Sequence, residues 1–218
     1  MKVEVFYDTL CSWCRVAKIN FKHAVEKLTA EGKIDPKNLE IIYRSYVIYP
    51  EIPDCGLDYQ QMIIDDDDLD AIDPKHDTPI HRWGKRAGMD FFFERIKIKP
   101  NTYLGHQFLH MIDQKYFEAL LADIQYEYFV TGGNINDINF IAQLATKYIG
   151  AAKAEEIKNR ALAGERKDEV DADIQIAEDY NVDLLPMYVF DGKVRLEGGI
   201  LQKKFEDALL GKLEPNIN

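Results

Sequence analysis

Cysteine is scarce in this sequence, since 218 residues contain only three. Three cysteines do not make the dense disulfide framework that holds small secreted domains together. Basic residues are also in the minority, with 27 Lys and Arg against 38 Asp and Glu and a net charge of −11. A chain this negative repels the phosphate backbone of nucleic acids and anionic membrane surfaces. We therefore expect neither nucleic acid nor membrane as a partner.

Long hydrophobic runs are missing as well. No stretch approaches the roughly 18 apolar residues that a transmembrane helix needs. The N-terminus leads into a strand pattern without a charged and apolar leader, so the expected location is the cytoplasm. With 46% hydrophobic and 30% charged residues, the composition is that of a globular protein with a sizeable core.

Two of the three cysteines stand where reactive chemistry is expected. The apolar residues 3–7 predict a strand, and Cys11-Ser12-Trp13-Cys14 follows at the start of an amphipathic helix that reaches about Ala30. A cysteine at a helix N-terminus faces unpaired N–H groups and the positive end of the helix dipole, which favour its thiolate. We expect Cys11 to be the nucleophile and Cys14, one turn further on, to be the resolving cysteine.

Two other interpretations of this pair remain open, namely half of a structural zinc site and two inert buried thiols. A zinc site needs two further Cys or His ligands at short spacing, and Cys55 alone remains. Because Cys55 lies in a turn-rich stretch without a basic neighbour, we expect an ordinary half-buried thiol, with an exposed regulatory thiol as the alternative.

No bound metal or cofactor is expected elsewhere. His106 and His110 are four residues apart, but the glutamate of an H-E-x-x-H motif is absent. The acidic cluster at residues 65–68 and Asp70 lacks the glycine and the terminal glutamate of an EF-hand loop. A solvated loop or helix end is the expected structure of this cluster.

The rest of the chain predicts one long helical segment between two mixed ends. A second strand at residues 39–46 completes a βαβ unit, and no further convincing strand precedes Met187. Several helices between them are expected to end at glycines, at positions 88, 132, 150 and 164. A helix at 165–180, a hairpin turning at Asp191-Gly192 and a final helix near 201–210 close the chain. The aromatic run 91–93 either lines a groove in part or packs entirely.

The combination of Cys11-Ser12-Trp13-Cys14, a long helical insertion and Leu185-Pro186 before a hairpin resembles the thioredoxin fold. More narrowly, it resembles the FrnE-type branch of the DsbA-like thiol–disulfide oxidoreductases. The resemblance implies an α/β, thioredoxin-like fold with a large all-helical insertion. Residues 1–56 and 165–218 would form the thioredoxin-like domain, and residues 57–164 the insertion. It also implies a cis Leu185–Pro186 bond lying against Cys11, in a loop whose backbone pairs with a substrate peptide.

Two positions depart from the pattern of that family. Members often carry Pro-His or Pro-Trp between the cysteines, where this chain has Ser12-Trp13. The residue before the proline is commonly β-branched, and Leu185 is not. The first departure leaves the redox potential open, and the second leaves the substrate preference open.

The function that follows from the resemblance is disulfide exchange without a bound cofactor. Cys11 and Cys14 would form the redox disulfide, and Ser12, Trp13 and Leu185-Pro186 would contact the substrate. Expected partners are protein or small-molecule thiols and disulfides, with glutathione or a thioredoxin-type protein as redox partner. The chain is expected to be a monomer or a homodimer.

Two alternatives belong to other functional classes. The fold also hosts glutathione-dependent isomerases and kappa-class transferases, in which residues 91–93 and Tyr103 would line a pocket for an apolar small molecule. Retention of two cysteines argues against that alternative, since one nucleophile or a bound thiol would suffice. The other is a non-enzymatic holdase or binding module in which the cysteines are incidental.

Overall fold

The computed structural model describes residues 1–61 and 78–217 and divides into two compact units. The first unit combines Met1–Tyr46 with Ile174–Asn218, and the second is Val47–Asp173. The division predicted from the sequence, at residues 56/57 and 164/165, has different boundaries, and as a statement about domains it stays a prediction. The acidic cluster at residues 65–70 lies outside the described residues.

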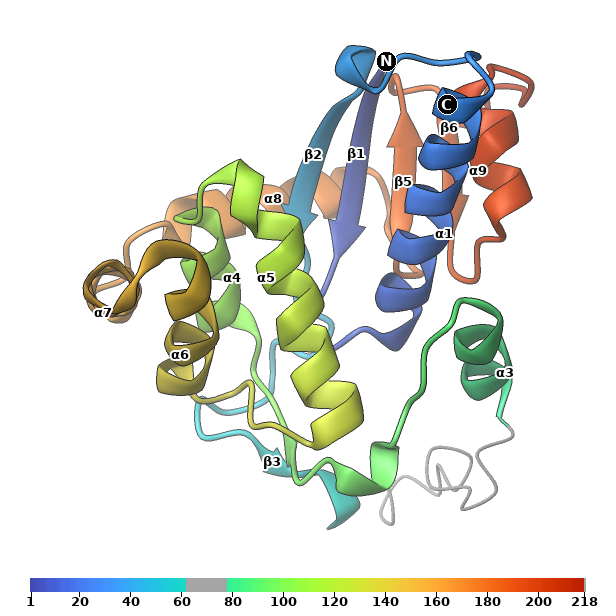
Figure 1. The fold of residues 1–218 in the computed structure, drawn as a ribbon. Coiled ribbons are helices and arrows are strands. Elements are labelled where there is room, and N and C mark those ends of the chain that lie inside the picture. The colour runs from blue at the N-terminus through green and yellow to red at the C-terminus, as the bar shows by residue number, and fades with distance from the viewer. Residues whose placement is uncertain (62–77, 218) are drawn as a thin grey trace. The chain divides into compact units, whose positions relative to one another are not determined.

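A mixed four-stranded sheet organises the first unit, in the order β2-β1-β5-β6 (Figure 1). Its strands are β1 (Lys2–Tyr7), β2 (Glu40–Ser45), β5 (Met187–Phe190) and β6 (Val194–Glu197). The pairing of β1 with β2 is parallel, and the β1–β5 and β5–β6 pairings are antiparallel. The βαβ unit and the closing hairpin predicted from the sequence are thereby confirmed.

Helices cover both faces of this sheet because the strand side chains alternate between them. Val3 and Val5 join a core with α1 (Ser12–Ala30) and α9 (Gln202–Leu209). Phe6 and Met187 point to the opposite face, where they pack with Ala177 of α8 (Lys167–Asp179). The sheet is therefore a rigid platform with hydrophobic contacts on both sides.

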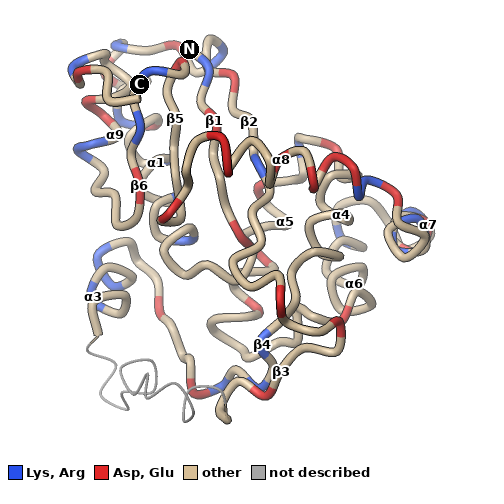
Figure 2. The backbone as a smooth tube through the Cα atoms, turned by 180° about the vertical axis from the view of Figure 1, so that it is seen from behind, with Lys and Arg blue, Asp and Glu red and all other residues tan. Residues whose placement is uncertain are grey.

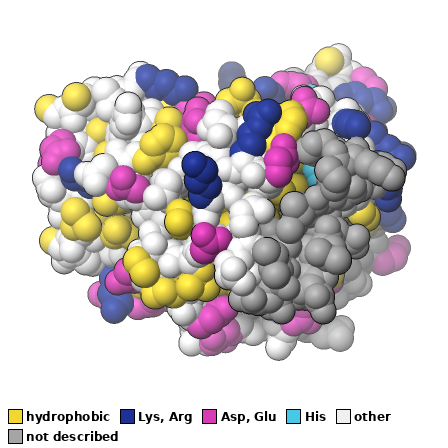
Figure 3. All heavy atoms as spheres, turned by 90° about the horizontal axis from the view of Figure 1, so that it is seen from below, with side chains coloured by type: hydrophobic (Ala, Val, Ile, Leu, Met, Phe, Trp, Pro, Cys, Tyr) yellow, Lys and Arg dark blue, Asp and Glu magenta, His cyan; other side chains and the backbone are white. Residues whose placement is uncertain are grey.

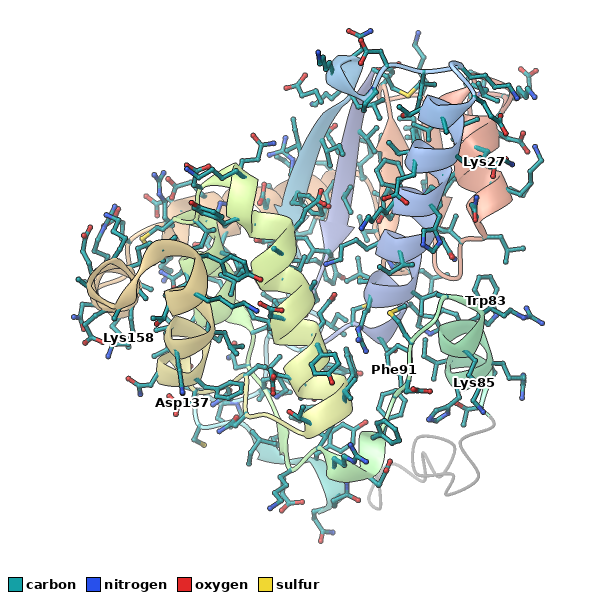
Figure 4. All side chains as sticks on the ribbon, in the orientation of Figure 1. Lys27, Trp83, Lys85, Phe91, Asp137 and Lys158 are labelled. Atoms are coloured by element: carbon teal, nitrogen blue, oxygen red, sulfur yellow. The ribbon has the colours of Figure 1, made fainter. Side chains whose placement is uncertain are left out.

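The two helices on the first face are also joined by charge. Lys27 of α1 reaches across to α9 (Figure 4), and its Nζ lies 2.8 Å from a carboxylate oxygen of Glu206. The Glu206 side chain is only 8% exposed, so the ion pair satisfies a nearly buried carboxylate. The short 3₁₀ turn η1 (Pro36–Asn38) then leads from α1 into β2.

The second unit is mainly helical, as predicted. Its α-helices, apart from the first half of α8, are α3 (Pro79–Arg86), α4 (Tyr103–His110), α5 (Gln114–Tyr126), α6 (Ile138–Ile149) and α7 (Ala151–Leu162). A π-helical turn, η4 (Glu127–Thr131), extends α5. The unit also contains an unpredicted antiparallel ladder of β3 (Leu57–Asp58) and β4 (Ile98–Lys99). Strands of two residues are too short to produce a period that a sequence pattern can detect.

The aromatic run at residues 91–93 is used mainly for packing. Phe91 and Phe93 are buried and stack with ring centroids 5.7 Å apart, and Phe129 packs edge-on against both. Figure 4 shows Phe91 beside α3, whose Gly84 leaves room for the ring. Phe92 precedes the 3₁₀ turn η3 (Phe93–Arg95) and is covered by the guanidinium of Arg95, 3.9 Å from its ring centroid. The packing alternative is the one that the structure favours.

Charged residues of both signs are distributed along the backbone (Figure 2). On the face seen from below, hydrophobic side chains lie between charges of both signs (Figure 3). Within residues 1–61 and 78–217, no helix is long and apolar enough to cross a membrane.

Two glycines with similar positive φ provide a test of packing in the second unit. Gly132 and Gly88 have φ of +80° and +73°. A Cβ at Gly132 would stand 2.2 Å from the backbone oxygen of Arg95, whereas one at Gly88 would meet nothing within 4 Å. We expect Gly88→Ala to cost about 1 kcal/mol of unfolding free energy through φ alone, and Gly132→Ala to cost about 3 kcal/mol. Urea denaturation measures both, and equal costs would contradict the packing described here.

Candidate active site in the first unit

The sheet register places two separate segments at one edge of the first unit. Phe6 is paired with Met187, and β1 runs antiparallel to β5. Continuing this register by one residue sets Tyr7 opposite Pro186, so the chain leaves β1 toward Cys11 where β5 begins. The Leu185–Pro186 peptide bond is cis, as the family resemblance implies. Its direct contact with Cys11 stays a prediction.

A tight turn after β1 brings Cys11 to the start of α1. The Cys11 N–H donates to the backbone oxygen of Asp8 at 3.2 Å, and the Leu10 N–H donates to the Asp8 carboxylate at 3.4 Å. Cys11 itself is the N-cap of α1, with an extended backbone at φ −84° and ψ 111°. The predicted position of Cys11 at a helix N-terminus is confirmed.

The cap is formed by sulfur. Cys11 Sγ accepts a hydrogen bond from the backbone N–H of Cys14 at 3.1 Å, where a serine or aspartate oxygen would ordinarily stand. Such an N–H lies at the positive end of the helix dipole, so it stabilises negative charge on the sulfur that accepts from it. Both cysteines are free thiols in this structure, and only 6% of Cys11 and 5% of Cys14 is exposed.

The surroundings of the Cys14 thiol favour its protonated form. Burial raises the pKa of the Cys14 thiol well above its usual value, and its hydrogen bond and charge interaction with Cys11 raise it further. Cys14 therefore keeps its proton near neutral pH and donates it in a hydrogen bond to the Cys11 sulfur. Cys11 thus faces two donors, the N–H and the S–H of Cys14.

Asp8 is a site residue that the sequence analysis did not identify. Its side chain is fully buried, and its backbone N–H donates a hydrogen bond to the Cys14 sulfur, which by itself lowers the pKa of that thiol. Its negative charge acts in the opposite direction and raises the pKa of Cys14. The sequence feature that could have identified Asp8 is its position, directly after the mostly apolar strand residues 3–7 and before the turn with Cys11.

The remaining predicted site residues lie around this turn in the first unit. Ser12 and Trp13 form the start of α1, and both are partly buried. Pro186 is buried and Leu185 is partly buried, packed against the core that contains Ala177. The substrate contacts predicted for these four residues stay a prediction.

The third cysteine and the paired histidines stand apart from the site. Cys55 belongs to the second unit and is exposed, so the expectation of a half-buried thiol is wrong; its turn closes through a Gly56 N–H donated to Pro53 and leaves it at the surface. His106 is fully buried, and His110 Nε2 lies 3.2 Å from Asp173. Among the described residues, no three His, Cys, Asp or Glu side chains gather as metal ligands.

Comparison with known families identifies the architecture built from these elements. The family model of the DSBA-like thioredoxin domain matches residues 2–210. The chain belongs to the DSBA-like thioredoxin domain family. No curated protein matches the sequence. A DSBA-like fold with a mixed sheet and many helices is what the strands and helices above form.

Solved structures of DsbA-like proteins share this fold. A probable DsbA oxidoreductase, SCO1869 from Streptomyces coelicolor, is 23% identical with a TM-score of 0.81, covering 97% of this chain and 89% of that one. The cytosolic disulfide reductase DsbM from Pseudomonas aeruginosa, solved with GSH, is 15% identical with a TM-score of 0.67, covering 97% and 98%. A 2-hydroxychromene-2-carboxylate isomerase is 15% identical with a TM-score of 0.57, covering 96% and 94%.

The raised pKa of Cys14 predicts how stability depends on pH. Above the ordinary thiol pKa of about 8.5, the folded reduced protein keeps this proton while the unfolded chain has lost it, so higher pH favours unfolding. We expect the stability of the reduced protein to fall as pH rises from about 8 to about 10, by up to about 1.4 kcal/mol per pH unit from this group. Urea denaturation under reductant measures the slope, and Cys14→Ser is the control. An unchanged slope in Cys14→Ser would contradict the assignment.

Proposed function

We propose that this DsbA-like protein catalyses thiol–disulfide exchange through Cys11 and Cys14. In the first step, the Cys11 thiolate attacks one sulfur of a substrate disulfide and forms a mixed disulfide. The other substrate sulfur leaves as a thiolate and takes a proton from solvent. The N–H of Cys14, aimed at the Cys11 sulfur, supports this role because it stabilises the attacking anion.

In the second step, Cys14 resolves the mixed disulfide. Cys14 loses its proton, and its thiolate attacks the Cys11 sulfur, which forms the Cys11–Cys14 disulfide and releases the second substrate thiolate. The substrate disulfide is thereby reduced to two thiols, and the dithiol of the protein is oxidised. The same steps run in reverse when the protein oxidises a substrate dithiol, and the redox partner sets the direction.

The second step needs a proton acceptor, because the Cys14 thiol is buried and its pKa is raised. We assign this role to the carboxylate of Asp8. The Asp8 side chain is fully buried, its charge acts on the Cys14 thiol, and its backbone belongs to the turn that holds Cys11. A carboxylate at this point accepts the proton without solvent entering the site, and returns it in the reverse reaction.

The partners and location follow the same line of argument. Glutathione or a thioredoxin-type protein would recycle Cys11 and Cys14, and protein or small-molecule disulfides would be substrates. The DsbM relative was solved with GSH and is described as cytosolic. These words support a cytosolic location and a glutathione partner as proposals for this chain.

The single observation that carries the function is a sulfur helix cap with a protonated thiol one turn behind it. We expect Cys11→Ser to reduce the rate of disulfide exchange to the uncatalysed level, since oxygen does not attack disulfide sulfur. We expect Cys14→Ser to retain the first step and to accumulate mixed disulfides with substrate. Intact-mass measurement and a dithiothreitol-coupled assay detect both outcomes. Turnover at the normal rate by Cys11→Ser would exclude the assignment.

The role of Asp8 makes a separate prediction. We expect Asp8→Asn to leave formation of the mixed disulfide nearly unchanged and to slow its resolution about 100-fold near neutral pH. Raising the pH should restore the rate, because hydroxide then removes the proton from Cys14. Stopped-flow and quenched-flow alkylation separate the two steps.

Glu4→Gln is the matched control for Asp8→Asn. Glu4 is a nearly buried carboxylate of β1, the strand that leads into Asp8, and it is 5% exposed and bound to Arg44 at 2.8 Å. Losing its charge tests the cost of altering β1 without touching the proton path. Equal slowing of resolution in both variants would assign the effect to strand damage and would remove Asp8 from the mechanism.

A glutathione-dependent isomerase is the alternative function, because a solved isomerase shares the fold. In that case Cys11 would hold or activate glutathione, and a small apolar substrate would react. Tight glutathione binding together with failure to exchange any protein disulfide would favour this alternative. The packed state of Phe91 and Phe93 removes two side chains that would have lined such a pocket.

A further inference from the structure

The second unit contains a cavity of about 680 Å³ whose lining includes neither Cys11 nor Cys14. Four segments line it, namely the chain after β2, the first turns of α4, the loop before α6, and the corner between α7 and α8. Its volume falls within the range of roughly 300–1,000 Å³ that is typical of small-molecule sites. Every lining residue belongs to the second unit.

The amide side chains of the cavity are already engaged with the surrounding backbone. Asn101 Nδ2 donates to the Ile52 oxygen at 2.7 Å, and Asn136 Nδ2 donates to the Asp54 oxygen at 2.8 Å. The Asn101 N–H in turn donates to Asn136 Oδ1 at 2.9 Å. These bonds tie the walls together, so the cavity is preformed and does not depend on a ligand for its shape.

Because the amides are engaged, the charged side chains are the polar groups of the cavity that can bind a ligand. Lys167, the first residue of α8, is one of the lining residues, and its ammonium group makes no ion pair within the described part of the chain. The Asp54 carboxylate, from the chain after β2, likewise has no ion pair there. The Asp171 carboxylate is a third charge, and it accepts a hydrogen bond from the Tyr103 hydroxyl. Burial and this carboxylate raise the pKa of Tyr103.

An apolar surface accompanies these charges. Val47 and Leu104 line the cavity, and Leu162 lines it with 58% of its surface exposed. A ligand that covers Leu162 removes apolar surface from water, which favours binding. The cavity therefore combines one cation, two anions and an apolar wall.

This combination excludes several ligand classes. A phosphate or another purely anionic ligand would meet two carboxylates in a chain whose net charge is −11. A neutral apolar compound would offer no opposite charge to Lys167 and Asp54, which are both exposed at the cavity. A divalent cation would be repelled by Lys167, and no three potential ligands gather within the described residues.

We infer that the cavity binds a short peptide with free termini, its carboxylate on Lys167, its ammonium group on Asp54 and an apolar side chain against Leu104 and Leu162. Each charged group of such a ligand meets an opposite charge that the cavity leaves unpaired. The site is independent of disulfide exchange, so it stands whether or not the proposed function is correct.

The test is isothermal titration of the full chain with tripeptides Ala-X-Ala, where X is Leu, Phe or Ser, with free termini. The same peptides with acetylated and amidated ends serve as the comparison. We expect the free peptides to bind and the capped ones to bind at least about tenfold more weakly, since each charged contact contributes on the order of 1.5–3 kcal/mol. Equal binding of free and capped peptides, or no binding by any free peptide, would overturn the inference.

Matched variants locate the binding. Lys167→Met and Asp54→Asn should each weaken the free peptides about tenfold or more. Lys85→Met, at an exposed lysine on α3 outside the cavity (Figure 4), should change nothing. Amide shifts in a ¹⁵N spectrum should gather in α4 and at the start of α8, and disulfide exchange should be unaffected by the peptides. Equal losses in Lys167→Met and Lys85→Met would contradict the site.

Discussion

The hydrogen bond from the Cys14 N–H to the Cys11 sulfur is the contact on which the candidate active site depends. It makes the first cysteine the cap of α1 and so fixes its side chain at the end of the helix where N–H groups are unpaired. It also holds Cys14 one turn behind, where burial keeps the thiol protonated. This one hydrogen bond thus gives the two cysteines different surroundings. The Cys11 sulfur accepts from a helix N–H, and the Cys14 thiol keeps its proton.

The sheet of the first unit determines where Cys11 and Cys14 lie. Phe6 and Met187 are cross-strand neighbours, so the turn after β1 and the cis-proline before β5 emerge at the same edge. Cores on both faces hold the two strands in register, because a slip of one residue would turn Val3 and Val5 away from α1. Asp8 is fully buried at this edge, in the turn that leads to Cys11.

The second unit shows a different use of buried side chains. Phe91 and Phe93 pack against Phe129, so these aromatic side chains belong to its core. The hydrogen bond between Asn101 and Asn136 instead helps to shape a preformed cavity. The helix α8 contributes residues to both units, with Lys167 in the cavity of the second and Ala177 in the core of the first. Membership in the DSBA-like family accounts for the fold, but not for the charges of this cavity.

Sequence patterns alone determined the elements with strong local signals. The strand before Cys11, the helix after it, the hairpin at Asp191-Gly192 and the glycine-terminated helices follow from periodicity and backbone chemistry, which neighbouring residues carry. The resemblance to DsbA-like proteins added the cis bond at Pro186, which the structure contains.

Only the tertiary structure decided which side chains meet across the chain. The ladder of β3 with β4 joins segments about forty residues apart, and its strands are too short to show a pattern. The burial of Asp8 beside Cys14, the exposure of Cys55 and the gathering of Lys167 with Asp54 depend likewise on long-range packing. Local sequence carries no record of such contacts, because a side chain's solvent exposure and its charged neighbours are set by residues remote in the chain.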